Sequence, residues 1–185
     1  MGEWKTKTLG ELTALMTKGI APSYVEKESE NTVRVLNQKC NRDFTISYAE
    51  SRFNDLTKKK VSDERYVIPG DVLINSTGTG TAGRVAQIWD VPYKTTIDGH
   101  MILMRPTNEI DVLYYGYAIK MNQAKVESFA EGSTGQTEIN KRRLADEVEI
   151  SYPVDLAEQH RIARMLADID EKIENNKKIN DNLAA

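Results

Sequence analysis

The sequence is too poor in cysteine and histidine to build a metal site from these residues. Its one cysteine, Cys40, excludes an internal disulfide and a cysteine-based zinc site, and fits a reducing cytoplasm. The two histidines, His100 and His160, lie far apart and lack the spacing of metal ligands. We therefore expect no bound metal, and we expect a cytoplasmic protein.

Long apolar stretches and an excess of positive charge are also missing. No apolar run approaches the length that spans a membrane, and the first residues lack the apolar core of a signal peptide. The net charge of −3 provides no general positive field that would attract nucleic acid. Any contact with DNA would therefore depend on local patches or on a partner protein, and we expect no contact with a membrane.

The motifs of common enzyme classes are absent as well. The glycine-rich segment 76–83 follows a predicted strand, but it lacks the Lys-Ser/Thr pair of a phosphate-binding loop and leads into another strand rather than a helix. There is no H-E-x-x-H helix, no G-x-S-x-G turn, and no Asn/Asp-Pro-Pro-aromatic stretch. Asp98 and His100 would share one face of a strand, where a polar contact is commoner than an acid–base pair. We predict no catalytic residues, no cofactor in this chain, and no enzymatic activity of its own.

The residues that are present indicate a mixed α+β globular domain of short strands with few helices, followed by one long C-terminal helix. Leucine spacing predicts a short helix over residues 9–19, begun by Thr8 and closed by Gly19, and a second helix over 112–129. Alternation and apolar runs predict strands at 32–36, 44–47, 71–75, 84–89, 95–104 and 147–151. We assign residues 1–153 to the domain and 154–185 to the helix.

The long helix is the most strongly marked element. No Gly or Pro interrupts residues 155–183, and Asp155 with Glu158 resembles a capping box directly after Pro153. At 1.5 Å per residue the helix would be roughly 43 Å long. Its heptad seam comprises Ile162, Leu166, Ile169, Ile173, Asn176, Asn180 and Leu183. The seam predicts pairing with another helix, within which the two asparagines either select the register or face solvent near a fraying end.

Three polar segments contain residue types that suit DNA contacts. Asn and Gln can pair bidentately with adenine, and Arg or Lys with guanine or phosphate. The alternatives are a turn held by Asn side chains at 37–42, a hairpin turn at 76–84, and a charged linker at 132–143. The candidate DNA-binding residues are Asn37, Gln38, Lys39, Asn41, Arg42, Ser76, Thr77, Thr79, Arg84, Ser133, Thr134, Gln136 and Lys141.

Four stretches together carry a family resemblance. They are WKTKTLGEL, PGDVLINSTGTGTAGRVAQI, FAEGSTGQTEINKRRLADEVEISYP and DLAEQHRIARMLADIDEKI, in this order along nearly the whole chain. The chain resembles the specificity subunit of type I restriction–modification systems, with one target-recognition domain and its conserved helix. The resemblance implies a subunit that reads double-stranded DNA through loops at 37–42, 76–84 and 133–141.

The same resemblance implies partners that carry the chemistry. Methyltransferase (M) subunits would dock on this chain and use S-adenosylmethionine to methylate adenine, and a restriction/motor (R) subunit would use ATP and Mg2+. The usual subunit has two recognition domains and this chain has one, so we expect a half-length subunit or a fragment. In either case the seam favours a homodimer that reads two inverted half-sites. Alternatives are a recognition domain cut from a fused restriction–methylation enzyme and a coiled-coil assembly protein that does not read DNA.

Overall fold

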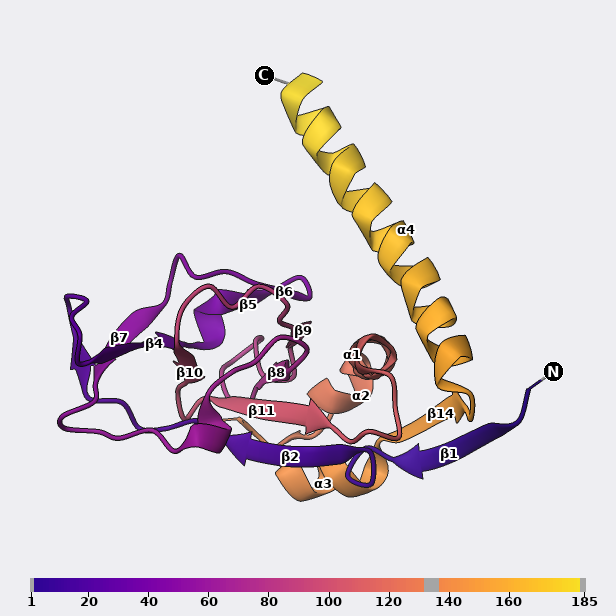
Figure 1. The fold of residues 1–185 in the computed structure, drawn as a ribbon, viewed down its shortest axis with the longest axis horizontal. Helices are drawn as coiled ribbons and strands as arrows, with labels where there is room; N and C mark the ends of the chain where they lie inside the picture. Colours follow the sequence, from indigo (N-terminus) through magenta and orange to yellow (C-terminus); the bar gives the residue numbers. More distant parts are fainter. Residues whose placement is uncertain (1, 132–136, 184–185) are drawn as a thin grey trace.

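The computed structural model describes residues 2–131 and 137–183, which form a mixed α+β fold with a projecting C-terminal helix (Figure 1). The strands are β1 Trp4–Thr8, β2 Thr13–Lys18, β3 Tyr24–Val25, β4 Thr32–Leu36, β5 Asn41–Arg42, β6 Thr45–Ile46, β7 Arg52–Asp55, β8 Val72–Asn75, β9 Val85–Gln87, β10 Thr95–Ile97, β11 Met101–Pro106, β12 Ala130–Glu131, β13 Glu138–Ile139 and β14 Glu149–Pro153. The α-helices are α1 Val112–Met121, α2 Gln123–Glu127, α3 Lys141–Glu147 and α4 Leu156–Leu183, and short 3-10 helices span Gln38–Cys40 and Asp63–Arg65. The predicted fold class is confirmed.

A central antiparallel sheet, with strand order β2-β11-β8-β9, is covered on both faces. Side chains alternate along β8, so Val72 and Ile74 join the core beneath the helices while Leu73 joins the core on the opposite face. All three side chains are fully buried. Burial on both faces explains why Val72, Leu73 and Ile74 form a continuous apolar run rather than an alternating pattern.

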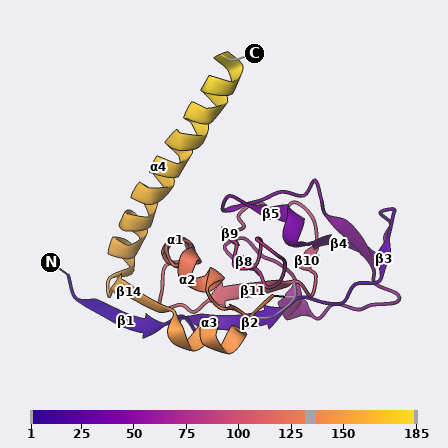
Figure 2. The same ribbon diagram turned by 180° about the vertical axis from the view of Figure 1, so that it is seen from behind.

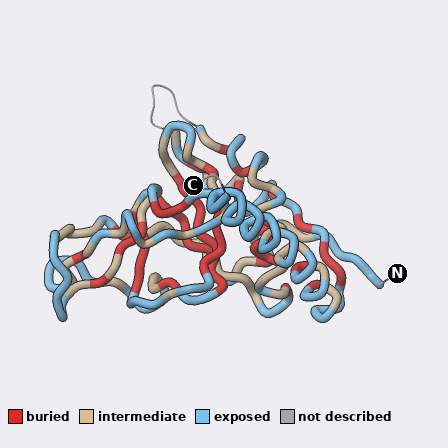
Figure 3. Tube along the Cα trace, turned by 90° about the horizontal axis from the view of Figure 1, so that it is seen from above, coloured by how far each residue is buried: buried red, intermediate tan, exposed pale blue. Residues whose placement is uncertain are grey.

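The second four-stranded sheet, ordered β10-β4-β7-β3, closes the other core. Strand β4 pairs in parallel with β10 and antiparallel with β7. Leu36 and Ile97 from this sheet pack in one cluster with Leu73 and Leu103 from the central sheet. Buried positions therefore concentrate in the globular part of the chain, as Figure 3 shows.

The single strand predicted for residues 95–104 is wrong, because the structure divides this stretch between the two sheets. A turn separates β10 from β11, with the Met101 amide donating to the Asp98 carbonyl at 3.1 Å. Strand β10 then pairs with β4, whereas β11 pairs with β2 and β8. Asp98 and His100 consequently lie in the turn and not on one strand.

The helix predicted for residues 9–19 is also wrong, although its start signal is real. The Thr8 amide donates to the Glu11 carboxylate at 2.9 Å, and the Glu11 amide donates to the Thr8 hydroxyl at 3.3 Å. The chain then forms one tight turn and continues as β2 instead of a helix. Pairing of β1 with β14 and of β2 with β11 supplies the backbone partners that a helix would have supplied.

The long helix is confirmed, and α4 begins beside the β1–β14 pair (Figures 1 and 2). Buried Gln159 ties its first turns down, since its amide donates to the Pro153 carbonyl at 2.8 Å and accepts from the Asp111 amide at 2.7 Å. Farther along, the Asp170 carboxylate accepts hydrogen bonds from α1. Residues 171–183 are all exposed, so the last turns of α4 project beyond the domain.

Candidate nucleic-acid interface

Two of the three polar segments named from the sequence are joined through one side chain. The Gln38 amide donates to the Thr77 hydroxyl at 3.0 Å and accepts from the Thr81 hydroxyl at 3.2 Å. The Gln38 carbonyl also accepts from the Asn75 side chain at 3.1 Å. Residues 37–42 and 76–84 therefore form one continuous polar surface.

The asparagines of the first segment are engaged within the protein. Asn41 is fully buried and donates to the carbonyls of Leu73 at 3.3 Å and Arg84 at 3.0 Å. Asn37 begins the short 3-10 helix by accepting from the Lys39 amide at 2.9 Å, and it donates to the Glu50 carbonyl at 2.7 Å. In this structure these amides support the loop, and their contact with DNA stays a prediction.

The second segment is the hairpin that connects β8 and β9, in agreement with the predicted alternative of a hairpin turn at residues 76–84. Glycines allow its tight path, since Gly83 has a φ of +88° and a Cβ there would come within 2.7 Å of the Cα of Glu127. Ser76 is fully buried, whereas Thr79 at the tip is exposed. The helix N-terminus that a phosphate-binding loop requires does not follow, because β9 does.

The third segment joins the same surface through β13. The Ile139 amide donates to the Ser76 carbonyl at 2.7 Å, so residues far apart in the sequence meet beneath the hairpin. Lys141 is exposed at the start of α3, which Asn140 caps by accepting from the amides of Arg142 and Arg143. Helix α3 was not predicted from the sequence, although Asn140 before Lys141 is an N-cap signal. Ser133, Thr134 and Gln136 lie outside the described residues.

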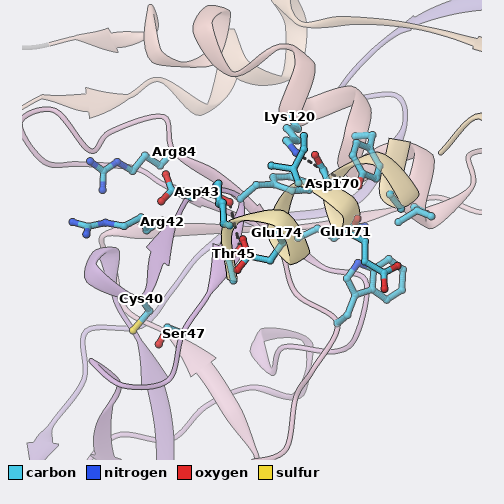
Figure 4. Close-up of a pocket in the computed structure, with 18 of the residues that line it drawn as sticks. Cys40, Arg42, Asp43, Thr45, Ser47, Arg84, Lys120, Asp170, Glu171 and Glu174 are labelled. Carbon is cyan, nitrogen blue, oxygen red and sulfur yellow. Dashed lines mark hydrogen bonds and ion pairs between the residues drawn. The ribbon is translucent and has the colours of Figure 1, made fainter. Parts of the chain in front are cut away.

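Exposed Arg42 and Lys39 and half-buried Arg84, whose guanidinium donates to the Gly80 carbonyl at 3.2 Å, line a cleft between the domain and α4. The cleft has a volume of about 1960 Å³, and Figure 4 shows Arg42 and Arg84 extending in the same direction. Its cations include Arg42, Arg84, Lys120, Arg164, Lys177 and Lys178, and its acids include Asp43, Asp170, Glu171 and Glu174. Arg42, Arg84 and Lys39, which also lines the cleft, were predicted from the sequence, whereas the other cations lie on helices α1 and α4 and were not. The charge of the cleft is therefore mixed rather than strongly positive.

Asp98 and His100 support the loops and form no acid–base pair with each other. The Asp98 carboxylate accepts from the His100 amide at 3.0 Å, and the His100 Nδ1 lies 2.9 Å from the Thr77 hydroxyl. Burial raises the pKa of Asp98, and burial together with the Asp98 carboxylate raises the pKa of Tyr24 to about 12.

Burial also raises the pKa of the Cys40 thiol, which disfavours a reactive thiolate. Within residues 2–131 and 137–183, no group of three His, Cys, Asp or Glu side chains is arranged to hold a metal ion.

The predicted seam of α4 splits into two parts. Ile162 and Leu166 are half-buried near the domain, whereas Ile169 is 52% and Ile173 is 48% exposed. Met165, which the seam prediction did not include, is 63% exposed. Asn176, Asn180 and Leu183 continue the seam on the projecting turns.

Over the part of the chain that the structure describes, none of the helices is both long and apolar enough to cross a membrane.

The described chain thus combines a mixed α+β domain, in which three polar segments are linked by hydrogen bonds, with one long projecting helix. The chain belongs to the family of type I restriction modification DNA specificity domains, whose family model matches residues 1–185. A comparison with curated proteins found no match.

Solved structures share this fold. The type I restriction–modification S subunit from M. genitalium matches with a TM-score of 0.63 at 22% identity, over 94% of this chain and 41% of that chain. The HsdS subunit from Thermoanaerobacter tengcongensis matches with a TM-score of 0.68 at 19% identity, over 95% of this chain and 39% of that chain. A chain from a structure of type I R-M complex assembly and conformational transition gives a TM-score of 0.68 at 19% identity, over 95% and 40%. The chain thus spans about two fifths of the length of these subunits.

Proposed function

We propose that this chain reads one half-site of a bipartite DNA target and directs partner subunits of a type I restriction–modification complex to it. The observation that carries the proposal is that hydrogen bonds join the three polar segments into one surface. Arg42 and Arg84 both line the adjoining cleft. Sequence reading needs side chains from several loops held in fixed relation, because each base edge must be met at a defined place. The chain itself supplies no chemistry in this proposal.

Within that surface, the side chains divide into readers and supports. Arg42, Lys39 and Arg84 are the cations of the first two loops, and a guanidinium can contact guanine bidentately or pair with a phosphate. Gln38 and Asn41 hold the two loops together through their hydrogen bonds. Exposed Lys141 would add a contact from the third segment.

Helix α4 would supply the assembly surface. Exposed Met165, Ile169 and Ile173 favour a partner helix, and a second copy of this chain would give a two-fold dimer with inverted half-sites. Adenine methyltransferase subunits would dock on the helical part and use S-adenosylmethionine, and a restriction/motor subunit would join with ATP and Mg2+. One solved structure of similar fold comes from work on assembly of the type I R-M system, which supports a role in assembly.

The mixed charge of the cleft predicts weak DNA binding by the isolated chain. Asp43 lies beside the Arg42 loop, and Arg164 and Lys178 each face an acid of their own helix at 3.1 and 4.0 Å. Because neutralised phosphates supply most of the affinity for DNA, partner subunits would have to contribute cations. We expect weak, salt-sensitive binding, and nanomolar, sequence-selective binding by the isolated chain at physiological salt would contradict this.

The test uses the assembled methyltransferase complex and its mapped target. Arg42→Ala and Arg84→Ala should each lower methylation of the target by roughly 5-fold or more, since one base contact is worth about 1–3 kcal/mol. Lys58→Ala is the matched control, because Lys58 is 67% exposed but lies outside all three segments. Wild-type methylation rate and selectivity in both arginine variants would refute DNA reading by these loops and favour a purely structural assembly role.

A further inference from the structure

The hairpin that carries Arg42 contains an unusual turn. Strands β5 and β6 pair Asn41 with Ile46 and Arg42 with Thr45, so Asp43 and Phe44 form a two-residue connection. Their φ angles of +53° and +59° make it a left-handed turn that favours Asn-Gly. An L residue in this region costs about 1–2 kcal/mol, and a bulky aromatic side chain is a genuine outlier there. Some interaction of Phe44 must therefore offset the strain of the turn.

The side chain of Phe44 anchors the hairpin to α1. Its ring centroid lies 5.7 Å from that of Tyr117, and the Lys120 Nζ lies 4.5 Å from the Phe44 ring centroid. The backbone of Phe44 also lies beside that of Ala86, next to the β8–β9 hairpin. Aromatic and cation–π contacts of this kind contribute about 0.5–1.5 kcal/mol each, so the two together are comparable to the cost of holding Phe44 in the left-handed conformation.

The same two residues of α1 also hold the long helix. The Asp170 carboxylate accepts from the Tyr117 hydroxyl at 2.9 Å and from the Lys120 Nζ at 2.5 Å. Asp170 lies where α4 leaves the domain, because every residue from 171 to 183 is exposed. Figure 4 shows Lys120 facing Asp170, while Arg42 on the hairpin extends away from them. A continuous set of contacts therefore runs from the hairpin through α1 to α4.

We propose that Phe44 is a positioning residue, which fixes the Arg42 hairpin relative to α4 through Tyr117, Lys120 and Asp170. The contribution of this link to DNA specificity rests on the proposed function, whereas its geometry can be measured without DNA. If α4 sets the separation of two half-sites, a loose hairpin relaxes both the sequence and the spacing that the complex accepts.

Phe44→Gly separates this role from simple turn formation. Glycine suits the left-handed position and removes its strain, so a turn-only role predicts unchanged or higher stability with an unchanged hairpin position. The positioning role predicts that the variant folds while the hairpin loses its fixed distance to α4. Phe44→Tyr keeps the ring and should retain the wild-type geometry.

Double electron–electron resonance, which measures the distance between two spin labels, tests the geometry directly. Nitroxide labels at exposed Thr45 and Asn175, in a Cys40→Ala background diluted with unlabelled protein, report the separation of hairpin and helix. We expect a narrow distribution for the wild type and Phe44→Tyr, and a broadened or shifted one for Phe44→Gly. A wild-type distribution in Phe44→Gly overturns the proposal. If Phe44→Gly does not fold, Asp170→Ala, which breaks the other half of the link, replaces it with the same two outcomes.

A second readout uses the methyltransferase complex. Phe44→Gly should lower the preference for the natural spacer over one longer by a base pair by at least fivefold, while Phe44→Tyr retains it. Undiminished discrimination in Phe44→Gly overturns the proposed contribution to specificity. Methylation unaffected by both Arg42→Ala and Arg84→Ala would instead refute the proposed function and leave the distance result to decide the role of Phe44.

Discussion

The apolar seam of α4 predicts a specific loss of association when Ile169 is shortened. Ile169 lies at the middle of the helix Leu156–Leu183 and is 52% exposed in the single chain. In an antiparallel two-fold pair of fully overlapping helices, a central residue meets its own copy. Each dimer would then bury two Ile169 side chains against one another, and Ile169→Ala removes both contacts.

The magnitude follows from the exposed half of the side chain. Full burial of an isoleucine contributes about 1.5–3 kcal/mol, so burial of the exposed half contributes about 1 kcal/mol per protomer. The loss of about 2 kcal/mol per dimer corresponds to a roughly 30-fold increase in the dissociation constant. Alanine preserves helix propensity, so the fold of the single chain should be unaffected.

Sedimentation equilibrium of the isolated chain measures this effect against a matched control. Ile179 is also an isoleucine of α4 and is 54% exposed, but it lies about 80° away around the helix at 100° per residue. Ile179→Ala should leave the dissociation constant within about threefold of the wild type. Equal effects of the two substitutions, or none from Ile169→Ala, would refute the assignment of the seam.

Three further predictions concern stability, pH and register. Asp71→Asn should lower the free energy of unfolding by about 2 kcal/mol, because buried Asp71 accepts two 2.8 Å hydrogen bonds from partly exposed Arg105. Urea titration measures this change, and an unchanged midpoint would argue against a structural ion pair. Burial raises the pKa of Asp98 above its ordinary 3.8, so the native state holds this proton more tightly than the unfolded chain and the wild type should lose stability as pH rises above that value. Asp98→Asn should flatten this part of the pH–stability curve, and parallel curves for the two proteins would show that Asp98 does not contribute. Replacing Asn176 and Asn180 with Leu should strengthen association but permit several registers, and a single dimer form in crosslinking would favour the solvent-facing alternative.

Elements with local signals were predictable from the sequence. The start of α4 is marked by Asp155, which accepts from the Ala157 amide at 2.9 Å, and no Gly or Pro interrupts the helix. The apolar run of β8 likewise predicted a buried strand. These predictions were confirmed because the signals that they rest on, a capping side chain and an uninterrupted helical or apolar run, lie within a few residues of the element that they predict.

Elements that depend on distant partners were not predictable in the same way. Residues 9–19 contain a working Thr8–Glu11 cap, yet β2 forms because β11 lies beside it. Gln38 was named for its ability to read adenine, but its side chain holds Thr77, 39 residues farther on. Nothing in the local sequence indicates that Phe44 adopts a left-handed conformation, since tertiary contacts with Tyr117 and Lys120 hold it there.

Mapping methylated adenines in cells with and without this protein tests the central claim most directly. We expect a bipartite methylated sequence that disappears when the protein is removed and returns with the wild-type gene. With Arg42→Ala, we expect methylation of that sequence to be lost or relaxed at a base of the half-site, while Lys58→Ala restores the wild-type pattern. An identical methylation map in cells that lack the protein would contradict its role as the DNA-reading subunit.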